Sequence, residues 1–459
     1  MTRFKFVLFS FILLFVFGCS NQNQTEQTET PNVSESNVTQ SQTQSPETPK
    51  APQTPPEEPK EPIKLTFATP AGHTVENFNE RFGNSIQKQF PQYEISFVPR
   101  SDVSFDNLIV TGTEVDIVFG AIIDYTRGPI SFQMVEDMNE LVKQHNVDLD
   151  RISVDWQEGM STMWDGSLYG IPISLESNST FYNKDLFDAF GVEYPHDYIT
   201  WEEVFALNAR LTRSENNVNY IGVAIARPQH FSLNGLSVPF IDPETGQSAF
   251  GVDEYAAKWR TLYETLVTKP AEASGYREKM IELGRLPSNT EFYNGEAAMF
   301  VGLTHTPLSR PDLEEMNWDM TTYPTYEGYP DTGAQGNLLL FGITKMSKHK
   351  DEAMEVIKYF ISDEYQVETS RVGNIPIVIN DETIAAFAQD TYYHDRNVES
   401  VFKLDFAPLP YRTIYDPLTT GVYYNQNTLF SIIMEDLDIN TMMARMQEEA
   451  NQRIAAEQK

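Results

Sequence analysis

The chain has 459 residues, 40% of them hydrophobic, so it is long enough for more than one domain and can bury a sizeable core. Its formal net charge of -33 argues against nucleic acid as a partner, because the phosphate backbone would be repelled. Its single cysteine, Cys19, excludes a disulfide within the chain and a zinc site built from cysteines.

The N-terminus has the features of an export signal. Two basic residues, Arg3 and Lys5, precede an apolar run over residues 6–17, and Gly18 stands directly before Cys19. The run is shorter than the roughly 20 apolar residues that a membrane-spanning helix needs, and a basic start before a short apolar stretch is typical of a secretory signal peptide. The pattern resembles a bacterial lipoprotein signal, in which the cysteine becomes the acylated first residue of the mature protein.

The expected mature protein begins with a tether. We expect residues 1–19 to be the signal peptide and the acylated Cys19 to hold the protein at the extracytoplasmic face of the cell membrane; an uncleaved membrane anchor is the alternative. Residues 20–62 consist mainly of Gln, Thr, Ser, Glu and Pro, with almost no apolar residues to offset the entropy of ordering. We therefore expect a disordered, extended linker there, and a low-complexity tail without a role is the alternative.

The folded body begins at Ile63 and alternates strands with helices. Ile63, Leu65 and Phe67 alternate with polar residues, which predicts a strand. Three further elements follow: a helix over residues 74–90, a strand over 91–99 and a short buried strand over 114–120. This order implies an α/β body with a largely parallel sheet.

Later segments contain recognisable helix signals. Thr200 is a favourable N-cap, and Glu203 completes a capping box with it. Residues 347–362 carry apolar side chains on one helical face. Those apolar residues are Ala353, Val356, Ile357 and Phe360. A C-terminal amphipathic helix is expected to be capped near Asp438 or Asn440.

Motifs for catalysis are absent from the sequence. It contains no nucleotide-binding, zinc-protease or serine-hydrolase motif, and its seven histidines are too scattered for a tight metal pair. Residues 436–447 imitate a calcium loop but have Thr441 and Gln447 where Gly and a bidentate Glu are needed, so a helix cap is the better interpretation. We expect no enzyme activity, no metal and no cofactor, although 66 acidic residues leave a glycosidase-type carboxylate pair open.

Four blocks of the sequence, in order, resemble the extracellular solute-binding proteins of ABC importers called family 1, which includes maltose-binding protein. The blocks span residues 168–212, 292–302, 342–364 and 438–454. They contain the strings LYGIPISLESNSTFYNKDLF, FYNGEAAMFVG, GITKMSKHKDEAMEVIKYF and DINTMMARMQEEANQRI. The resemblance extends over the whole body, from about Ile63 to Lys459.

The resemblance implies a type II, periplasmic-binding-protein-like fold, which is a bilobal α/β fold with two lobes joined by crossover hinge strands. The lobes would comprise residues 63–175 with 342–385 and residues 177–337 with 386–459. Crossovers would fall near Ser174–Ser177 and Leu338–Gly342. A ligand would be held in the cleft between the lobes, and a membrane permease would recognise the form closed on the ligand.

The same resemblance implies a function. The protein would capture a carbohydrate or related solute as a monomer and deliver it to the membrane subunits of an ABC transporter without catalysing a reaction. Three alternatives stay open: a receptor that presents its ligand to a sensor kinase, a tethered polysaccharide hydrolase and a purely structural surface protein. The sequence does not identify the solute.

Glu176 is the strongest site candidate. It lies in an otherwise apolar, strand-like segment, where a charge costs energy unless it is paired or bound. The resemblance places it on a ligand-contacting glutamate at the crossover, and a carboxylate can accept hydrogen bonds from two sugar hydroxyls. A salt bridge that holds the hinge is an equally weighted alternative.

Three further candidates follow predicted strands. His73 lies in the loop after the first strand, where the family places polar contacts, or in a turn that merely caps the next helix. Asp124 and Tyr125 follow the strand over 114–120, near the next binding loop of the family, although Tyr125 can equally belong to the core.

The last four candidates concern sugar rings and anions. His305 falls where the family often has a tryptophan that stacks on a sugar, so the missing platform argues against a long oligosaccharide. Tyr326 and Tyr411 can supply aromatic faces instead, with core packing as the alternative. Arg371 can bind an anionic sugar or a phosphate, with a surface salt bridge as the alternative.

Overall fold

The computed structural model describes residues 62–101, 105–153, 156–157, 160 and 166–458. The chain divides into two units, Met1–Lys60 and Glu61–Lys459. Cys19, the signal peptide and the linker up to residue 61 lie outside the described residues. Among the residues described, no helix combines the length and the apolar character needed to cross a membrane.

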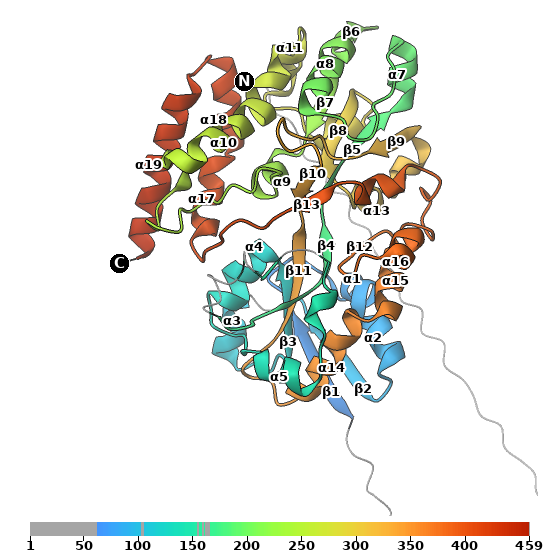
Figure 1. The fold of residues 1–459 in the computed structure, drawn as a ribbon, viewed down its shortest axis with the longest axis vertical. Helices are drawn as coiled ribbons and strands as arrows, with labels where there is room; N and C mark the ends of the chain where they lie inside the picture. The colour runs from blue at the N-terminus through green and yellow to red at the C-terminus, as the bar shows by residue number, and fades with distance from the viewer. Residues whose placement is uncertain (1–61, 102–104, 154–155, 158–159, 161–165, 459) are drawn as a thin grey trace, which may run out of the picture. The chain divides into compact units, whose positions relative to one another are not determined.

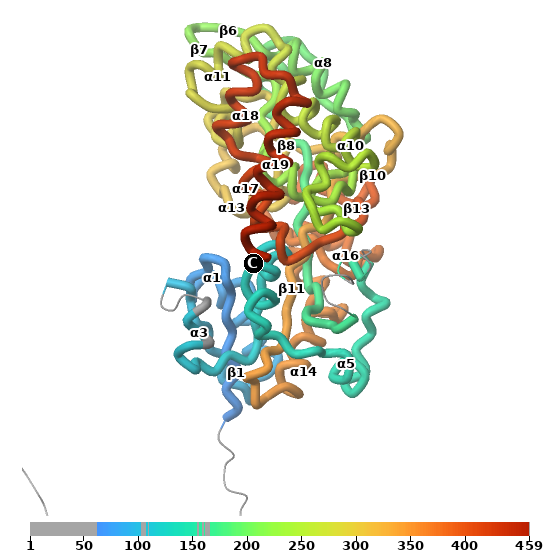
Figure 2. The backbone as a smooth tube through the Cα atoms, turned by 90° about the vertical axis from the view of Figure 1, so that its left-hand side faces the viewer, coloured from blue at the N-terminus to red at the C-terminus, as the bar shows by residue number. Residues whose placement is uncertain are grey.

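A six-stranded sheet organises one region of the Glu61–Lys459 unit, here called the first-sheet region (Figure 1). Its strands are β1 (Ile63–Ala68), β2 (Tyr93–Val98), β3 (Ile117–Ala121), β4 (Ile171–Glu176), β11 (Asn337–Ile343) and β12 (Ile375–Pro376). The spatial order is β12-β4-β11-β3-β1-β2. β1 is parallel to β2 and β3, whereas β11 is antiparallel to β3 and β4. β11 and the N-terminal β1 flank β3 in this sheet, although they lie far apart in the sequence, and Figure 2 shows both in the same part of the molecule.

A five-stranded sheet organises the second-sheet region. Its strands are β5 (Asn178–Asn183), β6 (Arg213–Glu215), β7 (Val218–Ile225), β8 (Ala297–Leu303) and β9 (Trp318–Thr321), in the order β6-β7-β8-β5-β9. β7 and β8 are parallel, so their carboxyl ends lie at the same edge of the sheet. A separate parallel pair consists of β10 (Thr332–Gln335) and β13 (Asp405–Ala407).

Helices cover both regions (Figure 1). Those of the first-sheet region are α1 (Val75–Phe78), α2 (Asn84–Gln89), α3 (Phe105–Thr111), α4 (Ile122–Tyr125), α5 (Asn139–Gln144), α14 (Lys350–Phe360), α15 (Asp363–Arg371) and α16 (Asp381–Ala386). Those of the second-sheet region are α7 (Lys184–Phe190), α8 (Trp201–Leu211), α9 (Arg227–Ser232), α10 (Asp253–Tyr263), α11 (Tyr276–Leu283), α12 (Asn289–Tyr293), α13 (Thr306–Ser309), α17 (Asp416–Tyr423), α18 (Gln426–Met434) and α19 (Ile439–Glu457).

The helix signals read from the sequence are confirmed. The Thr200 hydroxyl accepts from the Glu203 amide at 3.2 Å while the Glu203 carboxylate accepts from the Thr200 amide at 2.8 Å, so α8 begins with a capping box. The four apolar residues expected on one face of α14 are fully buried. Asp438 caps α19 by accepting from the Thr441 amide, so the segment that imitates a calcium loop is a helix cap.

The helix expected over residues 74–90 is interrupted by a wider turn. Thr74 caps α1, and a π-helical turn over Asn79–Gly83 separates α1 from α2. Such wide turns are frequent at functional sites because they change the direction in which side chains point.

Two very short links connect the six-stranded sheet to other strands. Ser177 alone separates β4 from β5 of the five-stranded sheet, and Gly336 alone separates β11 from β10, which pairs with β13. Asn337 of β11 and Glu176 of β4 are paired directly across the two strands. The links that adjoin them, Gly336 and Ser177, therefore lie next to each other at the same edge of the sheet. The lobe boundaries expected from the sequence remain predictions, although β11 places residues 338–342 inside the six-stranded sheet.

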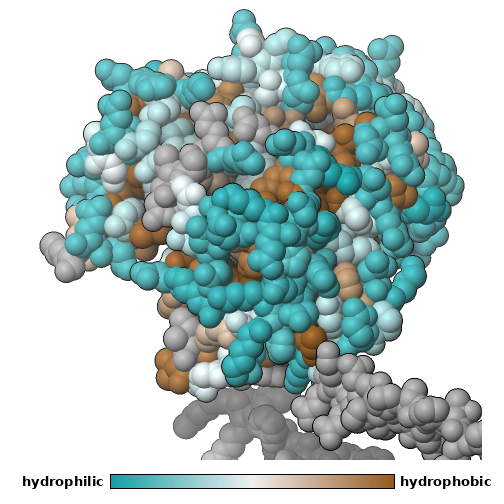
Figure 3. Space-filling view, turned by 60° about the horizontal axis from the view of Figure 1, so that its bottom comes forward, coloured by the Kyte–Doolittle hydropathy of each residue, from teal (hydrophilic) through white to brown (hydrophobic). Residues whose placement is uncertain are grey.

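The surface is mainly hydrophilic on one face. Figure 3 shows hydrophilic residues over most of one face, with hydrophobic residues in small separate patches.

Close packing at Gly222 gives a first testable expectation. A Cβ at Gly222 in β7 would lie 2.3 Å from the Asn208 Cα, which belongs to the backbone of α8 and cannot turn aside. We expect Gly222→Ala to lower the free energy of unfolding by about 1–3 kcal/mol, as is usual for overpacking. Urea unfolding followed by circular dichroism measures the change. Gly72→Ala is the control, because its Cβ meets nothing within 4 Å; equal losses for the two variants would contradict the expectation.

Candidate functional site

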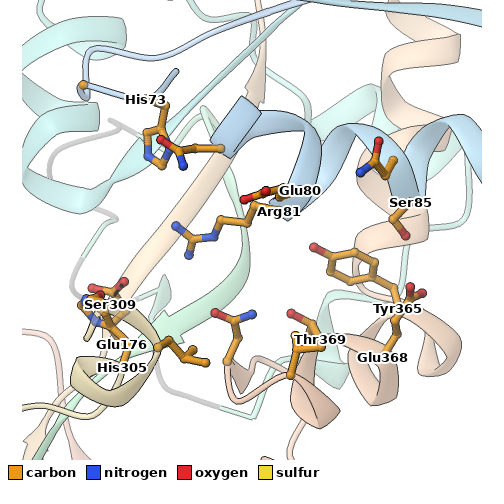
Figure 4. Close-up of a pocket in the computed structure, with 16 residues that line it drawn as sticks. His73, Glu80, Arg81, Ser85, Glu176, His305, Ser309, Tyr365, Glu368 and Thr369 are labelled. Carbon is orange, nitrogen blue, oxygen red and sulfur yellow. Dashed lines mark ion pairs between the residues drawn. The ribbon is translucent and has the colours of Figure 1, made fainter. Parts of the chain in front are cut away.

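A pocket of about 800 Å³ is lined by residues of both sheet regions (Figure 4). The first-sheet region contributes the loop after β1, the α1–α2 segment, the end of β4, and α15 with the loop after it; the second-sheet region contributes α13 and the turn before it. The lining residues are Gly72, His73, Asn77, Glu80, Arg81, Asn84, Ser85, Glu176, His305, Leu308, Ser309, Tyr365, Glu368, Thr369, Val372 and Asn374.

Three of the residues proposed from the sequence meet in this pocket. His73 follows β1, Glu176 ends β4 and His305 follows β8. The carboxyl ends of strands in α/β proteins are a common place for ligands, because loops there are free to present polar side chains. The topology of the two sheets therefore brings together residues that lie far apart in the chain.

Glu176 faces His305 across the two regions. Its Oε1 lies 3.5 Å from the His305 Nδ1, and both side chains are about 30% exposed, at 29% and 30%. Among the described residues no other cation pairs with this carboxylate, and no hydrogen bond to it is present. Because a histidine is charged only when protonated, the contact leaves Glu176 with acceptor capacity for a ligand.

The turn that carries His305 is fixed by its neighbour. The Thr304 amide donates to the Ser177 carbonyl at 2.8 Å, and the Thr304 hydroxyl lies 2.9 Å from the Ser179 hydroxyl. Ser177 is the single residue between β4 and β5. His305 is thus held against the same crossing that positions Glu176.

His73 contributes an imidazole to the pocket. Burial lowers the pKa of His73, the nearby charge of Arg81 lowers it further, and Glu176 opposes the shift. The ring lies edge-on to Phe119, with 5.7 Å between the centroids. A neutral imidazole has one donor and one acceptor nitrogen, which suits a hydroxyl group.

The sequence did not point to several other lining residues. Glu80 and Arg81 come from the π-helical turn Asn79–Gly83, while Tyr365 and Glu368 come from α15. Figure 4 shows the Arg81 guanidinium directed into the space between His73 and the Glu176–His305 pair. Within the described part of the chain, Arg81 has no ion pair and its charge lies 5.1 Å from the Phe82 ring centre. The polar face of the helix predicted after the first strand is the sequence feature that could have indicated Glu80 and Arg81.

Asp124, Tyr125 and Arg371 lie outside the pocket lining. Tyr125 is fully buried and its hydroxyl donates to the Tyr169 carbonyl at 2.6 Å, while Asp124 lies in the first turn of α4. Arg371 donates from Nε to the Asp390 carboxylate at 2.8 Å on the exposed surface. Tyr125 therefore packs in the core and Arg371 forms a surface salt bridge, which are the alternatives given for them above.

The two remaining tyrosines also lie outside the pocket lining. Tyr326 is buried beside Trp201, with ring centroids 6.1 Å apart. Tyr411 is half-buried in the segment that leads to α17. Among the described residues, no group of three or more His, Cys, Asp or Glu side chains is arranged to hold a metal ion.

The family model described as bacterial extracellular solute-binding protein matches residues 71–367. This match covers more than half of the chain. The chain belongs to the bacterial extracellular solute-binding protein family. The family expected from the four sequence blocks is confirmed.

Solved structures of solute-binding proteins share the fold. A sugar transporter from Rhizobium etli, in an open conformation, aligns with a TM-score of 0.66 at 17% identity, covering 84% of this chain and 99% of that chain. An ABC substrate-binding protein from Listeria monocytogenes, in complex with cycloalternan, aligns with a TM-score of 0.61 at 17% identity, covering 86% and 98%. The expected bilobal, type II periplasmic-binding-protein fold is therefore confirmed.

A curated relative matches part of this solute-binding protein. A Brucella abortus protein, whose name gives only an expected binding role, is 25% identical over 250 residues. The match covers 49% of this chain and 56% of the relative, so the chain spans about half the length of the curated relatives it matches.

Proposed function

We propose that this protein is the lipid-anchored, extracytoplasmic binding component of an ABC importer, and that it captures a carbohydrate and passes it unchanged to a membrane permease. The observation that carries the proposal is the position of Glu176, which faces His305 in a pocket built from both sheet regions. A ligand that contacts both residues would join the two regions and favour a closed form.

The chemistry of the lining supports a polyhydroxylated ligand. His73 and Glu176 offer acceptors, while Arg81 and Asn77 offer donors. Hydrogen bonds from hydroxyls to charged groups are stronger than those between neutral groups. Other proteins of this fold include one described with mannotriose bound and one with maltose bound, which favours the carbohydrate class here.

The N-terminal sequence supports the anchored location. A signal peptide over residues 1–19, an acylated Cys19 and an extended linker over residues 20–62 would hold the binding region near the membrane surface. The partners would be the membrane subunits of the importer, supplied by other chains. Such a protein needs no nucleophile or metal, because the solute is transferred without a chemical step.

Sugar-dependent stabilisation tests the proposal. Thermal unfolding of the purified full chain is followed with a panel of sugars, sugar acids and polyols. A true ligand at 100 times its dissociation constant should add about 2.7 kcal/mol to the free energy of unfolding. Glu176→Gln should weaken binding at least tenfold, because it removes a charged acceptor. Glu193→Gln is the control and should leave binding unchanged, because Glu193 is exposed and lies outside the pocket. The absence of stabilisation by every member of the panel would contradict the proposal.

A further inference from the structure

A second pocket of about 450 Å³ adjoins the first one. Both pockets include His305 and Ser309 in their lining, so they meet at the turn and short helix after β8. The second pocket lies beyond the carboxyl ends of β7 and β8, which is the edge where the parallel strands of this sheet end together. It is therefore placed to receive a ligand that continues past His305.

The lining of the second pocket has a different chemistry from that of the first. No carboxylate lines it, whereas Glu80, Glu176 and Glu368 line the first pocket. The side chains of Gln229 and Gln426 line it and make no hydrogen bond within the described residues. Unused amide groups offer both donors and acceptors to hydroxyl groups. The cation Arg227 also lines this pocket, but it is buried and donates to the Leu266 carbonyl at 2.7 Å and to the Pro287 carbonyl at 2.6 Å.

Two stacked planar groups, here called the Tyr293–Arg310 wall, line one part of the second pocket. The Arg310 guanidinium lies over the Tyr293 ring, with 4.0 Å between its central carbon and the ring centre. Asp312 neutralises Arg310 through two hydrogen bonds, at 2.8 and 2.5 Å. Because the guanidinium is already paired, the wall acts through its planar surface rather than as an anion site.

The junction between the pockets contains a polar atom without a partner. The Nδ1 atom of His305 is buried and forms no hydrogen bond among the described residues, although the Glu176 Oε1 lies 3.5 Å from it. A buried polar atom of this kind carries a desolvation cost until a partner reaches it. A hydroxyl group of a ligand passing from one pocket to the other would supply that partner.

We propose that the second pocket binds further rings of the same ligand, so that the solute is a neutral oligosaccharide of more than one ring and not a monosaccharide. This inference rests on the proposed function and names the ligand class for it. It differs from the expectation, drawn from the missing tryptophan, that a long oligosaccharide is disfavoured. The Tyr293–Arg310 wall supplies the flat surface that His305 does not.

Ligand length tests the inference. Affinities of the full chain are measured by titration calorimetry with malto-, manno-, cello- and xylo-oligosaccharides of one to four rings. Within the series that binds, affinity is expected to rise at least tenfold between one ring and three rings. Equal affinity for one and three rings would overturn the inference and leave the proposed function intact. No binding in any series or at any length would overturn both.

Two variants separate the pockets. Gln229→Ala combined with Gln426→Ala should weaken the three-ring ligand about tenfold and leave the one-ring ligand unchanged, since only the longer ligand reaches the amides. Gln92→Ala, an exposed amide that lines neither pocket, is the matched control. Glu176→Gln should weaken ligands of every length, because all of them use the first pocket. An equal loss for one and three rings in the double variant would overturn the assignment of the second pocket.

Discussion

Arg412→Met is expected to lower the free energy of unfolding by about 3–5 kcal/mol, because it leaves a buried carboxylate without its cation. Arg412 and Asp416 are only 3% and 4% exposed, and their Nη1 and Oδ2 atoms lie 3.6 Å apart. The same guanidinium donates to the Ser232 carbonyl at 2.9 Å and to the Gln335 amide oxygen at 3.1 Å. The substitution therefore removes both a charge pair and two buried hydrogen bonds.

The pH dependence of this loss follows from Asp416. Burial raises the pKa of Asp416 to about 6, and Arg412 together with Thr413 opposes the shift. Because the folded-state pKa lies above the ordinary value of 3.8, this carboxyl favours folding most below that value and less as the pH rises through about 6. The penalty of Arg412→Met should thus be larger at pH 7.5 than at pH 5, where the protonated acid needs no cation.

Guanidinium unfolding of both proteins at the two pH values measures the effect. Adding Asp416→Asn to Arg412→Met should restore part of the stability, since the unpaired charge is removed. Arg371→Met is the matched control, because Arg371 pairs with Asp390 in an exposed position and its loss should change the stability little. A loss in Arg412→Met no larger than that of the control would contradict the role given to the buried pair.

Acidification is expected to destabilise the protein through His230 by about 2 kcal/mol between pH 7 and pH 4.5. His230 is fully buried, its Nε2–H donates to the Val301 carbonyl at 2.9 Å, and its Nδ1 has no partner among the described residues. Burial is the main cause that lowers the pKa of His230 to about 4, with a smaller contribution from the charge of Arg227. The folded state therefore favours the neutral imidazole. Its stabilisation is complete above pH 6.5 and is lost as the pH falls towards 4.

His230→Gln isolates this contribution, because glutamine keeps a donor but does not titrate in this range. The free energy of unfolding of the wild type should fall more steeply on acidification than that of the variant. Asp416 changes stability in the opposite direction over the same range, so the difference between the two proteins is the quantity to compare. His394→Gln, an exposed histidine, should retain the wild-type slope. Parallel slopes for wild type and His230→Gln would refute the expectation.

Local patterns in the sequence predicted much of the fold. The capping box of Thr200 and Glu203, the buried face of α14 and the Asp438 cap depend on residues within one turn or one helix, so spacing alone reveals them. The π-helical turn over Asn79–Gly83 was not predicted, because its residues are compatible with a regular helix. Tertiary packing decides such a turn, and packing is not visible in the periodicity.

The site was predictable only where a residue ends a strand. Glu176 and His73 follow strands whose carboxyl ends can be placed from the sequence. Arg81 and Tyr365 lie on helices and reach the pocket only because α1, α2 and α15 pack around it. On α15, Glu368 and Thr369 line the pocket while Arg371 pairs with Asp390. Which face of that helix lines the pocket is decided by tertiary packing.

The one-residue links at Ser177 and Gly336 have a consequence for the thermodynamics of ligand capture. Each residue contributes only two soft backbone dihedral angles, so a one-residue link gives the two strands that it joins few relative arrangements. The paired strands at Asn337 and Glu176 hold both links in register. A protein with so few relative arrangements loses little conformational entropy when a ligand selects one of them. More of the contact energy then remains as affinity.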